Sequence, residues 1–424
     1  MTAATAEVTA SQDVQTLLTD LLLARGEEIE SWLDARRMES GAPFYSSVDL
    51  RHAGFKLAPV DTNLFPAGFN NLSAGARRRA SERVRARFAR YPQKIGRVLI
   101  VPENHTRNKY YIDNLEALCG VLRDAGCEVR VGSLAATPGQ PLVVENTTGG
   151  TLEELPLTRK GSLLATEDGF CPHIIILNND LTAGLPEVLR GVSQPIVPRP
   201  SLGWHRRRKS IHFDAYDRLS RDFADTFGID PWLLTTESHK CGRVDFAEKQ
   251  GMECIAVGVE KVLHRVRAHY TRYGIAAEPY VYVKADSGTY GMGIMTVRSG
   301  EELLEINKKL RNKMDTIKEG VHSTEVVIQE GVPTIDTVDG APAEPMLYLI
   351  DAHAVGGAYR VNAERDTTNN LNAPGMRFAG MCDEGEANGS CVLTSGKCFG
   401  AFGLVAELAS LASPREEYGD SYSI

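Results

Sequence analysis

Apolar residues recur at roughly helical spacing in residues 13–37, with acidic residues between them, and this pattern predicts an N-terminal helix. Short extended pieces follow at 47–50 and 55–60, and the residues that link them predict a hairpin with Gly54 in its turn. Arginines crowd residues 73–90 between a few apolar side chains. We interpret that stretch as a basic, partly exposed helix.

Short apolar runs alternate with helical patterns in the middle of the chain, which favours a parallel α/β sheet. The predicted strands are 98–101, 128–131 and 174–177, and the predicted helices are 111–125 and 185–189. Residues 133–170, rich in Gly, Thr and Glu, are interpreted as a loop excursion or a small insertion.

A further unit begins near residue 223. It is expected to contain helices at 258–273, 300–318 and 401–411, and strands at 280–284, 326–330 and 346–362. We therefore expect three units: an N-terminal helix and hairpin (1–95), an α/β substrate-binding domain (96–222) and a nucleotide-binding domain (223–424).

Composition narrows the class of protein. The chain has 424 residues, 42% of them hydrophobic and 24% charged, as in ordinary globular proteins. Its 47 basic and 55 acidic residues give a net charge of -8, which argues against a protein that coats nucleic acid. The first ten residues lack a basic, apolar leader and no apolar run is long enough to span a membrane, so we expect a cytoplasmic protein. The eight cysteines include no Cys-x-x-Cys pair, and we expect reduced thiols.

The most informative stretch is a predicted strand that ends on Lys284 and runs into a glycine-rich loop. Glycines let backbone amides approach phosphate oxygens, and the ammonium adds positive charge. The loop matches neither the Walker A nor the Rossmann pattern. We interpret it as a nucleotide phosphate clamp; a plain glycine-rich hairpin loop is the alternative. The candidate ligands in this stretch are Lys284, Ser287, Gly288, Thr289, Tyr290, Gly291 and Gly293.

A lysine strand, a glycine-rich loop, a helix and then a strand ending in Gln329-Glu330 resemble the ATP-grasp superfamily. The resemblance implies an α/β, ATP-grasp-like fold in which Gln329, Glu330 and Val332 form the adenine-facing hinge. Downstream, Arg360 and Asn372 resemble the arginine-bearing strand and the second loop of that family. Arg360 would clamp a phosphate or a carboxylate with its planar fork. The alternatives are a surface ion pair for Arg360 and a turn cap for Asn372.

The metal-binding pattern of many ATP-grasp enzymes is missing after residue 375 but stands near the N-terminus, as Asp49, a hairpin turn, and then Asp61-Thr62-Asn63. This order suggests a circular permutation and is similar to the eukaryotic-type glutathione synthetases. That similarity implies Asp61, Asn63 and Asp286 as ligands of Mg2+, which prefers hard oxygen donors. The alternative is an Asx turn at Asp61-Thr62-Asn63 before a proline.

Polar residues follow two predicted strands of the middle domain, where α/β sheets bind ligands. We expect Arg107 and Asn179, with Arg51, to contact an acidic or amino-acid substrate. Helix capping by Asn108 or Asp113 is the alternative reading of the first loop. A second basic patch, residues 204–209, fits either an anion site or a solvated face.

Over its full length the chain resembles the small family of proteobacterial glutamate-cysteine ligases, through residues 46–71, 101–108 and 283–293. The resemblance implies ATP-dependent ligation of the γ-carboxylate of glutamate to the amine of cysteine, with Lys284 and Arg360 as catalytic residues and ATP and Mg2+ as cofactors. It implies small-molecule partners, no nucleic acid or membrane, and a possible homo-oligomer. The alternatives are another ATP-grasp carboxylate-amine ligase, such as a glutathione synthetase or a dipeptide ligase, and a non-catalytic polyanion binder.

Overall fold

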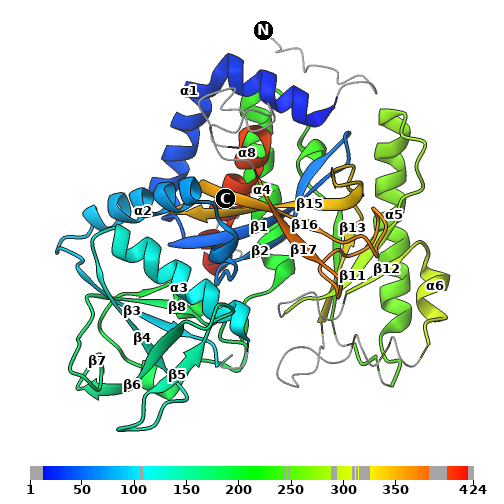
Figure 1. Cartoon of the computed structure of the whole chain (residues 1–424). Helices are drawn as coiled ribbons and strands as arrows, with labels where there is room; N and C mark the ends of the chain where they lie inside the picture. Colours follow the sequence, from blue (N-terminus) through cyan, green and yellow to red (C-terminus); the bar gives the residue numbers. More distant parts are fainter. Residues whose placement is uncertain are drawn as a thin grey trace.

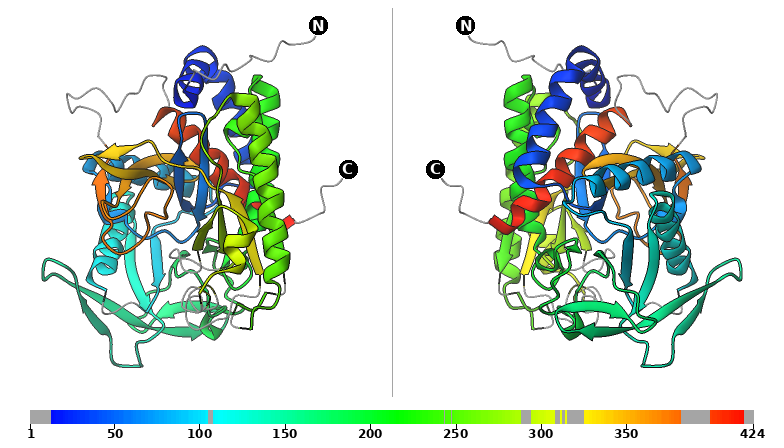
Figure 2. Two further views of the ribbon diagram at one scale, coloured as in Figure 1. Left: turned by 90° about the vertical axis from the view of Figure 1, so that its right-hand side faces the viewer. Right: turned by 90° about the vertical axis from the view of Figure 1, so that its left-hand side faces the viewer.

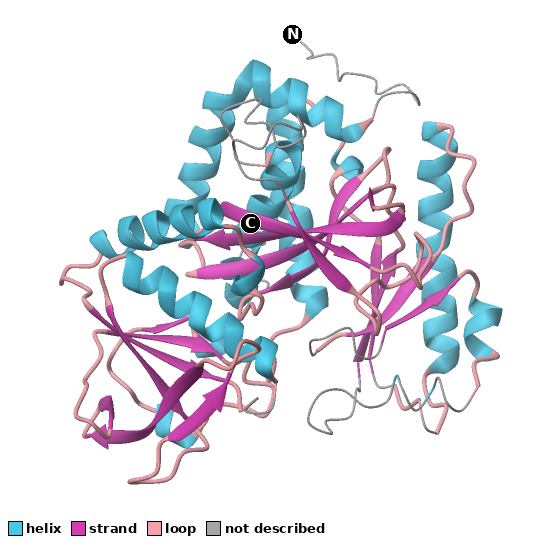
Figure 3. Ribbon diagram, in the orientation of Figure 1, coloured by secondary structure: helices cyan, strands magenta, loops and turns pink. Residues whose placement is uncertain are grey.

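The computed structural model describes residues 13–104, 108–242, 244–246, 248–287, 294–307, 311, 314, 325–381 and 399–418. These residues build three sheets, each accompanied by helices (Figures 1 and 3). The central sheet lies between the parallel sheet and the smaller antiparallel sheet (Figure 1). The expected mixed α/β class is confirmed.

The central sheet combines strands from both halves of the chain. Its order is β17-β16-β15-β1-β2, with β14 paired to β15. The strands are β1 (Tyr45–His52), β2 (Leu57–Asn63), β14 (Thr337–Val338), β15 (Ala341–Ile350), β16 (His353–Val361) and β17 (Arg377–Gly380). All neighbours are antiparallel, and Asp49 of β1 stands opposite Met346 of β15. The N-terminal hairpin therefore completes a sheet that the C-terminal third begins, as the expected permuted order requires.

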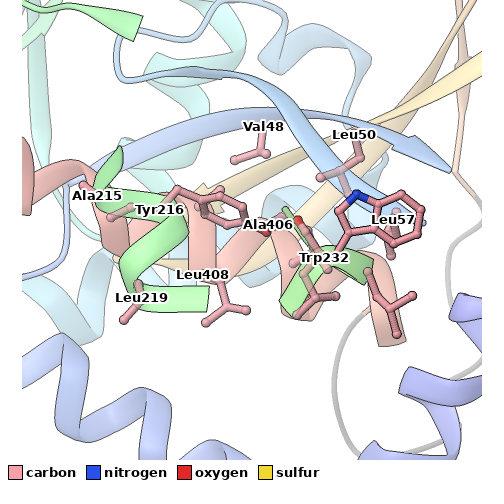
Figure 4. Close-up of a cluster of buried hydrophobic side chains, with 14 of the residues drawn as sticks. Val48, Leu50, Leu57, Ala215, Tyr216, Leu219, Trp232, Ala406 and Leu408 are labelled. Atoms are coloured by element: carbon pink, nitrogen blue, oxygen red, sulfur yellow. Dashed lines mark hydrogen bonds between the residues drawn. The ribbon is translucent and has the colours of Figure 1, made fainter. Parts of the chain in front are cut away.

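The two faces of this sheet have different roles. Val48 and Leu50 of β1 point to one face and join a core with α1 (Val14–Ser40), α4 (Lys209–Phe227) and α8 (Gly400–Ala412) (Figure 4). Helix α8 is apolar around most of its circumference, as expected of a helix buried on all sides. Because side chains alternate along a strand, Asp49 and Arg51 project from the opposite face. That face carries the candidate site.

The smaller sheet has the order β10-β13-β11-β12, and all its strands are antiparallel. Its strands are β10 (Ser238–Gly242), β11 (Val281–Ala285), β12 (Ile294–Val297) and β13 (Glu325–Glu330). Helix α5 (Met252–Tyr273) packs against it, with the short α6 (Gly300–Leu304) alongside. Gly258 of α5 permits this close packing, because a Cβ atom there would lie 2.5 Å from Ile328 Cδ1.

The third sheet is the predicted parallel one, with β4-β3-β8-β9 all parallel. Its parallel strands are β3 (Arg97–Pro102), β4 (Glu128–Ser133), β8 (Ile174–Asn178) and β9 (Ile196–Val197). Helices α2 (Ala74–Ala89) and α3 (Lys109–Asp124) share a core with one face of it. The predicted helices at 73–90 and 111–125 are thus confirmed.

Residues 133–170 are not a loop excursion. They form β5 (Leu142–Glu145), β6 (Thr151–Lys160) and β7 (Leu163–Thr166), and β6 extends the sheet in parallel with β4. These strands lie at the end of the molecule away from α1 (Figure 2). Their polar composition concealed them, because strands with one solvated face need few apolar residues.

Several expected boundaries differ from those in the structure. The hairpin turn begins later than expected, since Arg51 and His52 still belong to β1 and the Ala53 N–H donates to Lys56 O over 2.8 Å; Gly54 is in the turn with φ +78°. Residues 346–362 contain a hairpin, β15–β16, rather than one strand. The predicted helix at 185–189 is a 3-10 turn, and α4 runs across the expected boundary at 222/223.

The remaining elements are short 3-10 turns: η1 (Phe69–Asn71), η2 (Glu187–Leu189), η3 (Pro200–Leu202), η4 (Pro231–Leu233) and η6 (Ser413–Tyr418).

Among the described residues, five cysteines are all free thiols, as expected: Cys119, Cys127, Cys171, Cys241 and Cys254. No helix in the described part of the chain has the length and apolar character needed to cross a bilayer.

Candidate active site

A polar pocket lies where the central sheet meets the smaller antiparallel sheet. The central sheet and the loop after β16 contribute eight of its lining residues, the smaller sheet contributes four, and α4 contributes one. The lining residues are Asp49, Arg51, Val60, Asp61, Lys209, Tyr282, Lys284, Ala285, Ile294, Glu344, Arg360, Asn370 and Asn372. The predicted Lys284, Asp61, Arg360, Arg51 and Asn372 therefore meet in one pocket.

Two carboxylates of this pocket face each other across the N-terminal hairpin. Asp49 of β1 and Asp61 of β2 are direct partners in the antiparallel register, next to a bulge between Asp49 and Leu50. Directly opposed residues of an antiparallel pair point to the same face of the sheet. The hairpin thus delivers both carboxylates to the pocket.

A buried arginine network organises the floor of the pocket. Arg360 Nη1 donates to Asp49 Oδ2 at 2.7 Å and also to Glu344 Oε1, while Arg51 Nε donates to Glu344 Oε2 at 2.6 Å. Burial opposes the charge of Glu344, but the two arginines outweigh it and lower the pKa of this carboxyl. Arg360 is no surface ion pair, since its side chain is only 7% exposed. Its Nε–H is buried and has no acceptor among the described residues.

All of the hydrogen bonds that Arg51 makes among the described residues go to Glu344 and to backbone carbonyl oxygens, although it was predicted as a substrate ligand. Its Nη1 and Nη2 donate to the carbonyl oxygens of Thr367 and Asn369 at 3.0 and 2.7 Å. These contacts hold the loop that follows β16, which brings Asn372 to the pocket. The Asn372 N–H donates to Asn370 Oδ1 at 3.0 Å, so this loop is stabilised by an Asx turn.

Lys284 lies at the end of β11 with its residue 5% exposed. Its Nζ donates to the Val60 carbonyl at 2.9 Å and to Gln329 Oε1 at 2.7 Å, both neutral oxygens. Desolvation lowers the pKa of Lys284 to about 7, although the nearby Asp61 favours its charged form. A buried ammonium with neutral partners is suited to receive an anion.

Lys209, the first residue of α4, contributes a second ammonium. Its Nζ donates to Asp61 Oδ1 at 2.7 Å and lies 4.5 Å from the centre of the Trp204 ring. Burial would raise the pKa of Asp61, but the charges of Lys209 and Lys284 outweigh it and lower that pKa to about 2. Asp61 is therefore ionised throughout the physiological range.

The two other residues predicted as metal ligands lie differently. Asn63 Oδ1 accepts the N–H of Phe65 at 2.9 Å, which is the Asx turn of the alternative reading. Asp286 is fully buried and accepts both the N–H and the hydroxyl of Ser210, each at 2.7 Å. Neither side chain lines the pocket. Among the described residues, no three His, Cys, Asp or Glu side chains group together as a ready metal site.

The predicted hinge is buried at the end of β13. Glu330 holds the ammonium of Lys56 with both oxygens at 2.7 Å, and its Oε2 also accepts the Glu237 N–H at 2.9 Å. Gln329 and Val332 are completely buried, and Gln329 Nε2 donates to Thr236 Oγ1 at 2.9 Å. The Glu330 side chain thus anchors the β1–β2 turn to the hinge.

Some predicted site residues lie elsewhere or outside the described residues. Asn179 donates to the Pro102 carbonyl at 3.3 Å, at the end of the parallel sheet and away from the pocket lining. Asn108 caps α3 through the Tyr111 N–H at 3.3 Å, as the capping alternative expected. Ser287 is half-buried. Arg107, Gly288, Thr289, Tyr290, Gly291 and Gly293 fall outside the described residues.

Several residues that line the pocket were not among the predicted site residues. These are Asp49, Lys209, Tyr282, Glu344 and Asn370. Asp49 belonged to the permuted motif, and Lys209 stood in the second basic patch, so both carried a weak signal. Glu344 carried none, because only the pairing of β15 with β16 sets it opposite Arg360.

The chain is similar to known proteins over most of its length. The family model for glutamate-cysteine ligase matches residues 19–417. A crystal structure from Methylobacillus flagellatus, described as a γ-glutamylcysteine synthetase, is 42% identical, covers 97% of this chain and 98% of its own, and has a TM-score of 0.85. No curated protein matches the chain.

Two more distant structures are also similar. A glutathione synthetase-like effector from Globodera pallida is 11% identical over 86% of this chain and 80% of its own (TM-score 0.33). D-alanyl-alanine synthetase A from Vibrio cholerae is 9% identical over 60% and 67% (TM-score 0.28). The fold is of the mixed α/β class, with two antiparallel sheets around the pocket and a parallel sheet beside them, and it is shared with the Methylobacillus flagellatus structure. Because the family model spans most of the chain, this protein belongs to the glutamate-cysteine ligase family.

Proposed function

We propose that the pocket between the two antiparallel sheets is where this ligase joins glutamate to cysteine, with ATP bound through Lys284 and Mg2+ bound through Asp61. The observation that carries the proposal is the buried Lys284, whose described hydrogen-bond acceptors are both neutral. Opposite it stand the paired carboxylates Asp49 and Asp61, in the same pocket. The ammonium would bind the phosphates of ATP and the carboxylates would bind the metal ion, so the charges of the pocket complement a metal-bound triphosphate.

The residues present fit both groups. Asp61 is the more open carboxylate, with its side chain 36% exposed against 14% for Asp49. Mg2+ commonly binds proteins through one or two carboxylates and takes its other oxygens from substrate phosphates and water. Asp61, with Asp49 beside it, would supply the protein oxygens, and the ion would neutralise phosphate charge.

The chemistry rests on positioning and electrostatics. The γ-carboxylate of glutamate attacks the γ-phosphoryl group of ATP, which gives an acyl phosphate and releases ADP. The amine of cysteine then attacks the acyl carbon, loses a proton and displaces phosphate, which leaves the amide. Lys284 would hold the transferred phosphoryl group in line with the attacking carboxylate. Arg360, fixed by Asp49 and Glu344, would present its remaining Nε–H to an oxygen of the reacting carboxyl group.

Phosphate release from ATP and Mg2+ tests the proposal. We expect release with glutamate plus cysteine, and none with γ-glutamylcysteine plus glycine. Lys284→Ala should abolish it, because it removes the buried ammonium on β11 that the proposal assigns to the nucleotide phosphates. The control is Lys94→Ala, an exposed lysine that does not line the pocket.

The outcomes separate the alternatives. Release only with γ-glutamylcysteine plus glycine would point to the second enzyme of the pathway instead. Near-normal release by Lys284→Ala would remove this lysine from the site.

A further inference from the structure

Each carboxylate of the Asp49–Asp61 pair already holds an internal cation, but the two cations are held very differently. Arg360 binds Asp49 through two nitrogens and Glu344 through one, and its side chain is 7% exposed. Lys209 binds Asp61 through a single contact of 2.7 Å, beside a carboxylate that is 36% exposed. Of the two cations, Lys209 therefore makes fewer ion-pair contacts and faces the more exposed carboxylate, so it is the one that an incoming cation could replace.

The backbone of Lys209 is fixed, whereas its ammonium is held by one ion pair with Asp61 and by the face of the Trp204 ring. Its N–H donates to the Asp286 carbonyl at 2.7 Å, which anchors the start of α4. The ammonium sits at the end of a flexible four-carbon chain and lines the same pocket as Lys284. When it leaves Asp61, it stays within the pocket.

We infer that Lys209 is a displaceable counter-ion: it neutralises Asp61 in the free enzyme, yields this carboxylate to the divalent cation, and turns to the phosphoryl group of the bound nucleotide. The inference rests on the proposed function, because it takes Asp61 to be the metal ligand. An ammonium and a divalent cation repel each other, so they cannot both stay close to one carboxylate oxygen. Lys209 holds Oδ1 of Asp61, so a cation at either carboxylate oxygen would stand close to this ammonium. We therefore expect metal binding and the Lys209 pairing to compete, with reciprocal coupling.

Direct Mn2+ binding, followed through the electron paramagnetic resonance signal of the free ion, tests the inference on the full chain without nucleotide. Lys209→Met should tighten Mn2+ binding about three- to tenfold, the range expected when one partly exposed ion pair no longer competes. Lys209→Gln, which keeps a polar end, should do the same and stands in if the methionine variant folds poorly. In turnover, both variants should show a lower kcat, because the ammonium no longer reaches the phosphoryl group.

Two further variants make the result specific. Lys240→Met removes a nearby positive charge that pairs with Asp286 and Glu325 and not with Asp61, so Mn2+ affinity should not change. Asp61→Asn should weaken Mn2+ binding strongly.

If Asp61→Asn weakens binding while the Lys209 variants leave it unchanged, the counter-ion inference is overturned and the metal site stands. Equal tightening by Lys240→Met would also overturn it, since the effect would then be one of general charge. If Asp61→Asn has no effect, the metal assignment itself fails.

Discussion

At Lys284 the protein keeps an ammonium where burial opposes its charge. Desolvation brings the pKa of this side chain down to about 7, so the free enzyme carries a mixture of charged and neutral lysine near neutral pH. A phosphate bound to Nζ would favour the charged form and raise the pKa again. The proposed nucleotide contact would therefore link nucleotide binding to proton binding at this one residue.

We predict that ATP binding at pH 8 takes up about one proton, because Lys284 is largely neutral in the free enzyme and charged in the complex. Uptake should fall as the pH drops well below the free-enzyme pKa of about 7, where the lysine is already protonated. Calorimetry in two buffers of different ionisation enthalpy measures it. The Lys284→Met variant is the control, and uptake that persists in it would assign the proton to another group.

Single residues were predictable where a motif carried them. Lys284 ends a recognisable strand, and Asp61 and Arg360 belong to patterns of known spacing. Glu344 could not be found in this way, because its neighbours in space come from β1 and β16 and the sequence does not state the register. Lys209 could be assigned to the pocket only once it was known that α4 begins at this residue.

At the scale of elements, α4 begins with a cap from another part of the chain. Its own N-cap residue, Arg208, makes no side-chain cap, but Asp286 at the end of β11 accepts the Ser210 N–H and hydroxyl. A carboxylate at a helix N-terminus satisfies free N–H groups and complements the helix dipole. This contact fixes the end of β11 against the start of α4. It therefore also fixes the backbone of Lys284 relative to that of Lys209.

We predict that Asp286→Ala lowers the free energy of unfolding by about 1–3 kcal/mol, because it leaves buried donors of Ser210 unsatisfied. The dependence of turnover on Mg2+ should change little. Urea unfolding and a Mg2+ titration of activity measure the two effects. A Mg2+ requirement raised as strongly as in Asp61→Asn would instead make Asp286 a metal ligand.

The elements themselves were largely predictable from period and composition. The long helix at the start, the apolar strands of the parallel sheet and the apolar helix 401–411 all lie where expected. Errors came where the pattern was ambiguous: polar strands β5 and β6 resembled a loop, and the β15–β16 turn at Asp351-Ala352 carries neither Gly nor Pro. Positive φ angles of 56° and 55° at these two residues are unusual outside glycine.

At the scale of the whole molecule, the turn η6 near the C-terminus is connected to the pocket through Arg207. Glu416 of η6 accepts two hydrogen bonds from Arg207, at 2.8 and 2.9 Å, and contacts His212 Nδ1 at 2.7 Å. Arg207 in turn donates to the carbonyl of Thr62, the residue after Asp61. The end of the chain thus helps to position a carboxylate near its beginning, which no local sequence pattern reveals.

We predict that Glu416→Ala destabilises the protein by about 3–5 kcal/mol, because it leaves Arg207 buried without its carboxylate. The control on the same turn is Arg415→Ala. It removes a more exposed pair with Glu39 and should cost about 1 kcal/mol or less. Thermal and urea unfolding compare them, and equal losses would contradict the predicted support.

The pairing of β1 with β15 also governs when the site can exist during synthesis. Asp49 and its neighbour Met346 are separated by roughly 300 residues of chain. At the usual 5–20 residues per second, the N-terminal hairpin leaves the ribosome roughly 15–60 s before its partner strand is made. During that interval its inner edge has no strand to pair with, and the carboxylate of Asp49 lacks Arg360, its partner on β16. Lys209, the partner of Asp61, is made roughly halfway through the interval. Assembly of the proposed site must therefore await β15 and β16, which are made roughly 300 residues after the N-terminal hairpin.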